Sequence, residues 1–261
     1  METPEKTKAC PGCRDGEALD FAFSMAFQPI SDLQTRSVYA YEALVRGPNG
    51  EPAPEILARV TDANRYAFDQ QCRIKAIETA TAAGILQSDA RLSINFLPNA
   101  VYSPVACIQA TLKAAKAHDF PTDRLIFEFT ENEKMVDPDH VATIIAAYRK
   151  MGFCSALDDF GAGHAGLSLL AQFQPDIIKL DMELIRGIDI ALPRRLIVDS
   201  ILKLCASLGI TVIAEGIETA GELRVLEEMG VRYLQGFLFA RPAFETLPPV
   251  HFPPAMGLIA A

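Results

Sequence analysis

The sequence is poor in histidine, which is the commonest metal ligand in proteins. It has only four: His118, His140, His164 and His251. None of them is spaced from another histidine, or from a cysteine, in the manner of zinc ligands. A histidine-based zinc centre is therefore not expected, and we interpret His164 as a solvated loop residue.

Cysteine is also scarce, with six in the chain: Cys10, Cys13, Cys72, Cys107, Cys154 and Cys205. No spacing among them suggests a disulfide framework, so the reducing cytoplasm is the expected location. Only Cys10 and Cys13 form a close pair, and a single C-x-x-C is half of a zinc site. We interpret this pair as free thiols in a tail. An intersubunit zinc site or a redox switch remains an alternative.

Long apolar runs and an excess of basic charge are absent as well. No window of about 18 or more apolar residues predicts a membrane span, and the polar N-terminus has no signal-like stretch. The formal net charge of −9 at pH 7 argues against binding to long nucleic acid. It does not argue against a phosphate-bearing substrate, because a bound divalent cation can reverse the local sign of an acidic cleft.

Apolar residues, in contrast, make up 50% of the 261 positions. A chain of this length and composition can build one large domain with a single core, or two small domains. The first 20 residues are rich in Pro, Gly, Lys and Glu. We therefore expect a flexible tail over residues 1–20, followed by one domain over 21–261.

Strand-like runs alternate with helix-like ones after the tail. Helical periodicity is clearest in five segments: Arg65–Ala83, Pro104–His118, His140–Met151, Pro193–Leu208 and Ala220–Met229. Strands are expected at Met25–Ile30, Tyr39–Leu44, Arg91–Asn95, Leu125–Glu128, Cys154–Asp159, Ile177–Asp181, Thr211–Glu215 and Arg232–Gln235. This alternation favours an α/β fold of the TIM type, a (β/α)₈ barrel. An open doubly wound sheet ranks second, because no glycine-rich phosphate loop follows the first strand.

Polar residues recur near the ends of these strands. Because side chains alternate between the two faces of a strand, Glu42 shares a face with Ala40, and Glu128 with Ile126, while Phe127 faces the opposite way. A carboxylate in an apolar setting is costly unless it is paired or binds a metal. The active sites of barrels lie at the C-terminal strand ends, so we expect several strands to deliver polar side chains to one place.

The candidate ligands at these strand ends offer only oxygen: Glu42, Asn95, Glu128, Asp158 and Asp159. Ligation by oxygen alone selects hard cations such as Mg²⁺ or Mn²⁺. The adjacent carboxylates at 158 and 159 can bridge two such ions, and two metals about 3.5–4 Å apart suit in-line hydrolysis of a phosphodiester. Lys179 and Glu215 are then candidates to orient and deprotonate the attacking water.

These residues carry a resemblance to the EAL domain, a family of bacterial phosphodiesterases that linearise cyclic di-GMP to pGpG. Glu42-Ala43-Leu44, followed by Val45-Arg46, resembles the tripeptide that names the family. The resemblance runs from about Ser24 to Pro242 and also includes, in the family's order, Phe27–Ile30, Asn95, Glu128–Glu131, Asp158–Gly161, Lys179–Asp181, Ala214–Gly216 and Gln235–Phe237. It implies a barrel with one reversed strand at Met25–Ile30.

The resemblance implies a role for each matching residue. The first metal ion is expected to be bound by Glu42, Asn95, Glu128 and Asp158, and the second by Asp158, Asp159 and Glu215. Lys179 is expected to contact the attacking water, with Glu215 as the base and Glu131 as a brace for the loop after Asp159. The nucleotide and nearby solvent are expected to meet Gln28, Arg46 and Gln235, with Arg46 near phosphate. Asp181 and Glu218 are expected to support the site rather than bind metal.

Two departures from the family pattern are present. The loop Gly161–Leu167 lacks the aromatic-Ser-Ser run that is common after Asp-Asp-Phe-Gly in the family, where this loop couples dimerisation to metal binding. Gly47 stands where many relatives have tryptophan. We expect a homodimer whose interface is coupled to the loop after Asp159. Two alternatives to the phosphodiesterase are a receptor that binds the dinucleotide without cutting it, and a barrel glycosidase that uses two carboxylates.

Overall fold

The structure, a computed structural model, describes residues 19–101, 103–130, 138–163 and 166–253. Within these ranges, no helix combines the length and the apolar character needed to cross a membrane. The pair Cys10 and Cys13, the predicted brace Glu131 and the loop residue His164 all lie outside the described residues. The predicted tail over 1–20 falls almost entirely outside them too, so it stays a prediction.

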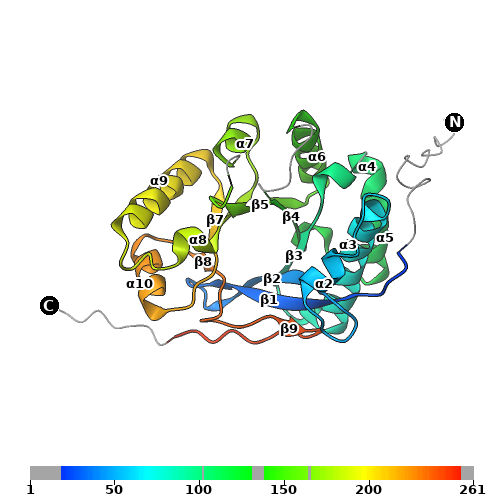
Figure 1. Cartoon of the computed structure of the whole chain (residues 1–261), viewed down its shortest axis with the longest axis horizontal. Helices are drawn as coiled ribbons and strands as arrows, with labels where there is room; N and C mark the ends of the chain where they lie inside the picture. The colour runs from blue at the N-terminus through cyan, green and yellow to red at the C-terminus, as the bar shows by residue number, and fades with distance from the viewer. Residues whose placement is uncertain (1–18, 102, 131–137, 164–165, 254–261) are drawn as a thin grey trace.

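Eight strands form a closed ring (Figure 1): β1 Ser24–Asp32, β2 Ser37–Arg46, β3 Arg91–Asn95, β4 Leu125–Thr130, β5 Cys154–Phe160, β6 Ile177–Leu180, β7 Thr211–Ala214 and β8 Tyr233–Leu234. Strands β2 to β8 pair in parallel, in sequence order. Strand β1 closes the ring by antiparallel pairing with both β2 and β8. The predicted (β/α)₈ barrel with one reversed strand is confirmed.

The helices surround this ring (Figure 1): α2 Ala53–Leu57, α3 Arg65–Ala82, α4 Pro104–Cys107, α5 Gln109–Ala117, α6 Pro138–Lys150, α7 Gly166–Gln172, α8 Met182–Ile185, α9 Leu192–Leu208 and α10 Ala220–Glu228. The single helix predicted over 104–118 is wrong. The helix is interrupted at Ile108 (φ −77°, ψ −14°), so α4 ends before this residue and α5 begins after it. Ser103 is the N-cap of α4, where its hydroxyl accepts the N–H of Ala106.

The predicted alternation of strand side chains is also confirmed. Outward-facing residues such as Leu92, Phe127 and Ile178 are buried in the large core between the strands and the helices. A second, smaller apolar cluster comprises Ile30, Ala40, Ile126, Ala156, Ile177 and Ile213. Each of these six lies two positions from a polar residue predicted for the site. The barrel interior therefore has an apolar floor, and the polar side chains lie above it.

The outer side of the reversed strand is covered by the C-terminal segment (Figure 1). A ninth strand, β9 Ala243–Phe244, pairs with β1. The next residue, Glu245, donates its N–H to the carbonyl of Met25 at 2.9 Å. Further along, the carbonyl of Pro248 accepts the hydroxyl of Tyr41 at 3.2 Å. A short hairpin joins β1 to β2, so no helix follows β1, and this segment shields it instead.

Candidate active site

The ammonium group of Lys179 lies at the centre of the polar layer. Its Nζ is 2.7 Å from Glu215 Oε1, 2.9 Å from Glu128 Oε2, 3.0 Å from Asp158 Oδ1 and 3.4 Å from Glu42 Oε2. The side chains of Lys179 and Glu128 are each only 1% exposed. The four carboxylates come from β2, β4, β5 and the residue after β7. The barrel therefore brings together side chains that are up to 173 positions apart in the sequence.

Burial perturbs the protonation of this cluster. Burial raises the pKa of Glu128 from 4.5 to about 8, although the positive charge of Lys179 opposes the rise. Burial also raises the pKa of Glu215 well above its ordinary value. For Lys179, burial alone would lower the pKa, but the surrounding carboxylates, led by Asp158, raise it well above its usual range. The raised carboxyl pKa values mean that one lysine does not supply enough positive charge for its neighbours.

The carboxylates form two overlapping groups with the geometry of metal sites. One contains Glu42, Glu128 and Asp158, and the other contains Asp158, Asp159 and Glu215; within each group the ligand atoms lie within 4.8 Å of one another. Asp158 belongs to both. These are the carboxylates that the sequence predicted for two ions, and a donor set of oxygen atoms fits hard divalent cations.

Asn95 lies at the edge of the first of these groups. It is the last residue of β3 and is exposed at the rim of the barrel. Its side-chain amide donates to Glu42 Oε1 at 3.3 Å. The structure thus brings Asn95 next to the carboxylates with which it was predicted to share a metal ion.

Both aspartates of β5 reach the site because the strand is irregular there. A regular strand would direct the side chains of Asp158 and Asp159 to opposite faces. The register between β5 and β6 shifts between Leu157 and Phe160, and Asp159 has a φ of 55°. Bulges of this kind re-aim a side chain next to an active site. A positive φ is uncommon for a residue other than glycine, so the surrounding fold must impose it.

Two glutamines extend the cluster toward the reversed strand. Gln235 Nε2 donates to Glu42 Oε2 at 2.7 Å and to Gln28 Oε1 at 3.3 Å. Gln28 Nε2 donates in turn to the carbonyl of Ala240 at 3.3 Å. The buried Oε1 of Gln235 has no hydrogen-bond partner among the described residues. Buried acceptors are normally satisfied, so this oxygen is available to a ligand or a water molecule.

Ser93 is a site residue whose role the sequence did not reveal. It is fully buried, and its hydroxyl donates to Glu128 Oε1. The sequence did offer one indication of this role. Ser93 lies two positions before Asn95 and therefore on the same face of β3. A hydroxyl at that position fixes the second oxygen of the Glu128 carboxylate, whose first oxygen contacts Lys179.

Arg46 is not brought into the carboxylate cluster. Its Nη1 donates to the carbonyl of Val45 at 2.7 Å. The residue lines a separate cavity of about 300 Å³ that also borders Asn95 and Leu97. Arg46 is thus adjacent to the site through Asn95, and its predicted contact with phosphate stays a prediction.

The cluster opens into a cavity of about 280 Å³, which is lined by Lys179, both glutamines and all the carboxylates of the cluster except Glu128, and also by Asp181, Met182 and Phe237. Asp181 is engaged as the N-cap of α8, where its carboxylate accepts the N–H of Glu183 at 2.7 Å. The turn after Glu215 requires glycine, because Gly216 has a φ of 70° and a Cβ there would lie 2.3 Å from the Cβ of Met182. Close packing of this turn against α8 fixes where Glu215 enters the cavity.

Two curated relatives illustrate the similarity of the sequence. The blue light- and temperature-regulated antirepressor BluF of Escherichia coli is 35% identical over 228 residues, which cover 87% of this chain and 56% of the relative. The probable cyclic di-GMP phosphodiesterase PdeN of E. coli is 29% identical over 228 residues, which cover 84% of this chain and 43% of the relative. The chain therefore spans about half the length of these relatives.

Solved structures agree with the fold. A standalone versatile EAL protein from Vibrio cholerae, solved with c-di-GMP bound, is 49% identical with a TM-score of 0.86, covering 90% of this chain and 98% of that one. A manganese and cyclic di-GMP complex of BlrP1 from Klebsiella pneumoniae is 36% identical with a TM-score of 0.80, covering 88% and 58%. The sequence matches the model of the family described as EAL domain over residues 17–242. The chain belongs to the EAL domain family.

Proposed function

We propose that this protein is a metal-dependent phosphodiesterase that hydrolyses cyclic di-GMP to the linear dinucleotide pGpG. The proposal is carried by the two sets of three carboxylates that share Asp158 and lie around the buried Lys179. Two cations held side by side in this way suit in-line displacement at a phosphodiester. The similarity to a relative named as a probable cyclic di-GMP phosphodiesterase supports the choice of substrate.

The proposed cofactors are two Mg²⁺ or Mn²⁺ ions. The first would be held by Glu42, Asn95, Glu128 and Asp158, and the second by Asp158, Asp159 and Glu215. Support comes from the all-oxygen donor set, and from the manganese named with cyclic di-GMP in the BlrP1 complex. When bound, such ions stabilise negative charge that develops on the phosphate and its leaving oxygen.

The remaining chemistry falls to side chains beside the carboxylates. Glu215 is the proposed base for the attacking water, because its carboxylate lines the cavity and a base must lie within reach of the proton that it takes. Lys179, 2.7 Å from Glu215, orients that water. Gln28 and Gln235 contact the nucleotide or its solvent, and Arg46 contacts phosphate from the neighbouring cavity. Glu131, which lies outside the described residues, is the proposed brace for the loop after Asp159.

The test is product formation by the purified chain. Cyclic di-GMP is incubated with Mg²⁺ or Mn²⁺, and pGpG is followed by chromatography. We expect turnover to stop in excess EDTA and to return when Mn²⁺ is restored. Unchanged turnover in EDTA would contradict the two-metal mechanism. Tight binding of cyclic di-GMP without product would identify a receptor instead, and cleavage of glycosides alone would identify a glycosidase.

Matched variants sharpen this assay. Glu42→Gln removes one carboxylate charge from the cluster, whereas Glu55→Gln makes the same change at an exposed position on α2. We expect the first substitution to suppress turnover and the second to leave it unchanged. Equal activities of the two variants would exclude Glu42 from the site.

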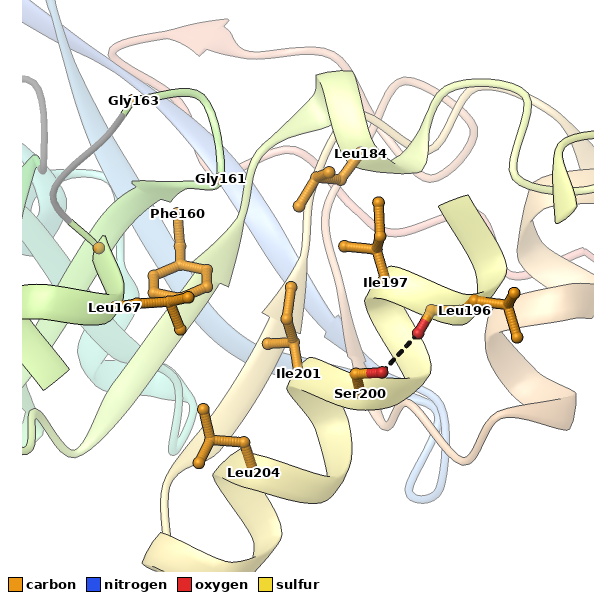
Figure 2. A pocket seen from close by; sticks show the side chains of 11 residues that line it. Phe160, Gly161, Gly163, Leu167, Leu184, Leu196, Ile197, Ser200, Ile201 and Leu204 are labelled. Atoms are coloured by element: carbon orange, nitrogen blue, oxygen red, sulfur yellow. Dashed lines mark hydrogen bonds between the residues drawn. The ribbon is translucent and has the colours of Figure 1, made fainter. Parts of the chain in front are cut away.

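We also propose a homodimer formed through an apolar groove of about 660 Å³. Figure 2 shows Ile197, Ile201 and Leu204 of α9 on one side of the groove, and Phe160 and Leu167 on the other. Leu167 is 65% exposed. Monomers rarely expose large apolar patches, and a second copy can cover this one, because a two-fold contact uses the same surface on both subunits.

The groove is linked to the metal site through the chain, because Phe160, which lines the groove, directly follows Asp159. A partner that covers the groove would offset the entropy lost when the glycine-rich loop after Asp159 becomes ordered. Light scattering and specific activity should be measured together across a dilution series. We expect a dimer whose specific activity falls as it dissociates, and a fully active monomer would contradict the coupling.

Location and domain limits complete the proposal. A cytoplasmic location is supported by Cys72, Cys154 and Cys205, described cysteines that form no disulfide. Structural disulfides are rare in that compartment.

An EAL domain that begins at residue 21 is supported by Phe21 and Phe23, which are buried in the main core. The preceding residues form the proposed tail.

A further inference from the structure

A buried ion pair on the outer helix α3 has no evident role in the site described above. Asp69 and Arg73 lie one turn apart, and their side chains are 1% and 0% exposed. Removing two charges from water is so costly that a well-packed apolar pair of similar volume is often equally stable or more so. Stability alone is therefore a weak explanation for this pair.

The contacts of the pair converge on the residues that follow Asn95. Asp69 Oδ1 accepts the backbone N–H of Leu97 at 2.8 Å. The Arg73 guanidinium donates to Asp69 and to the hydroxyl of Tyr148. Its central carbon lies 5.5 Å from the ring centroid of Phe96. The two charges thus hold Phe96 and Leu97, the two residues directly after the candidate metal ligand.

Phe96 has other support, because its ring packs against Phe127, Phe129 and Tyr148, whereas the N–H of Leu97 needs a partner of its own. The N–H of Phe96 still bonds to the carbonyl of Glu128 at 2.8 Å, which continues the pairing of β3 with β4. The N–H of Leu97 is the next one along, and it donates to Asp69 on α3 instead. The cavity of about 300 Å³ borders Asn95, Phe96 and Leu97. Atoms that face a void lack packing partners on that side, so packing supports Leu97 less than it supports the buried ring of Phe96.

We propose that Asp69, held in place by Arg73, is a positioning residue that fixes the backbone beyond Asn95 and so keeps the Asn95 side chain beside Glu42 for metal binding. The inference rests on the proposed function, because it assumes that Asn95 contributes to a divalent-ion site. Asp69 acts through the chain and touches neither substrate nor ion. Helix α3 thereby determines the geometry of a ligand on the inner ring of strands.

Two double variants separate the hydrogen bond from the charges. Asp69→Leu with Arg73→Met removes both charges and leaves Leu97 without its acceptor. Asp69→Asn with Arg73→Met also removes both charges, but an amide oxygen remains to accept the N–H of Leu97. Mn²⁺ binding to the full chain is measured by calorimetry, beside turnover of cyclic di-GMP. We expect about 10-fold weaker Mn²⁺ binding in the leucine variant, and binding within about 2-fold of the unmodified protein in the asparagine variant.

Two results would overturn the inference alone. One is Mn²⁺ affinity in the folded leucine variant equal to that of the unmodified protein. The other is an equal loss in both variants, which would assign the effect to the charges. Failure of the unmodified protein to bind Mn²⁺ would overturn the proposed metal site and this inference together. Circular dichroism establishes folding, and if the leucine variant unfolds, amide hydrogen exchange of Leu97 in the unmodified protein decides. Slow exchange is expected, and rapid exchange would overturn the inference.

Discussion

Replacement of Lys179 by methionine should strongly destabilise the protein when no divalent ion is present. Methionine fills a similar volume but carries no charge, so the carboxylates of Glu42, Glu128, Asp158 and Glu215 lose the ammonium group that lies 2.7–3.4 Å from them. Removal of one partner from a buried ion pair costs about 3–5 kcal/mol in the free energy of unfolding. Four carboxylates share this cation, so we expect the upper end of that range. Proton uptake by the carboxylates prevents a larger loss.

The assay is urea unfolding followed by circular dichroism, first in EDTA and then with Mn²⁺. With the proposed metal site, divalent ions bind the folded state and restore positive charge to the cluster, so they should recover about 2.7 kcal/mol at an ion concentration 100 times the dissociation constant. The matched control is Lys203→Met on α9. Lys203 also contacts a carboxylate, Asp199 at 2.6 Å, but the two side chains are 74% and 43% exposed.

An exposed pair of that kind contributes at most about 0.5 kcal/mol, so the Lys203 variant should unfold almost as the unmodified protein does. Equal free energies of unfolding for the two variants in EDTA would refute the reasoning. A loss in the Lys179 variant that Mn²⁺ does not reduce would show that the ions bind elsewhere.

Three further substitutions test separate parts of the structure. Glu42→Ala should lower both Mn²⁺ affinity and turnover by about 10-fold or more, because a direct ligand is lost; calorimetry beside steady-state rates measures both. Lys179→Ala should slow turnover by about 100-fold while weakening dinucleotide binding much less, and near-normal turnover would reject its catalytic role. Asp32→Asn tests acid stability, because Arg232 lowers the pKa of Asp32 from 3.8 to about 2. The lowered pKa of Asp32 corresponds to about 1–2 kcal/mol in the free energy of unfolding. This stabilisation is present above pH 3.8 and is lost as pH falls through about 2. The urea midpoints of the variant and the unmodified protein should therefore differ at pH 7 and converge near pH 2.

Local pattern was sufficient for much of the fold. The two-residue period of the strands predicted that Ala40 and Ile126 would share a face with Glu42 and Glu128, and both form part of the floor of the barrel. Because parallel strands share one C-terminal edge, the same period predicted that Glu42 and Glu128 would meet above that floor. The sequence predicted one helix over 104–118 where the structure has two. Hydrophobic periodicity continues through Ile108 and gives no sign that the helix is interrupted at this single residue.

The sequence by itself determined most of the residue types that reach the mouth of the barrel, because strand period and direction decide which side chains of a regular strand face inward. Tertiary structure decided how they are arranged there. The bulge that turns both Asp158 and Asp159 inward depends on pairing between β5 and β6. The hydrogen bond from Leu97 to Asp69 joins residues 28 positions apart. The raised carboxyl pKa values arise only when burial removes water from groups on separate strands. These features depend on distances between segments, which no local pattern of residues encodes.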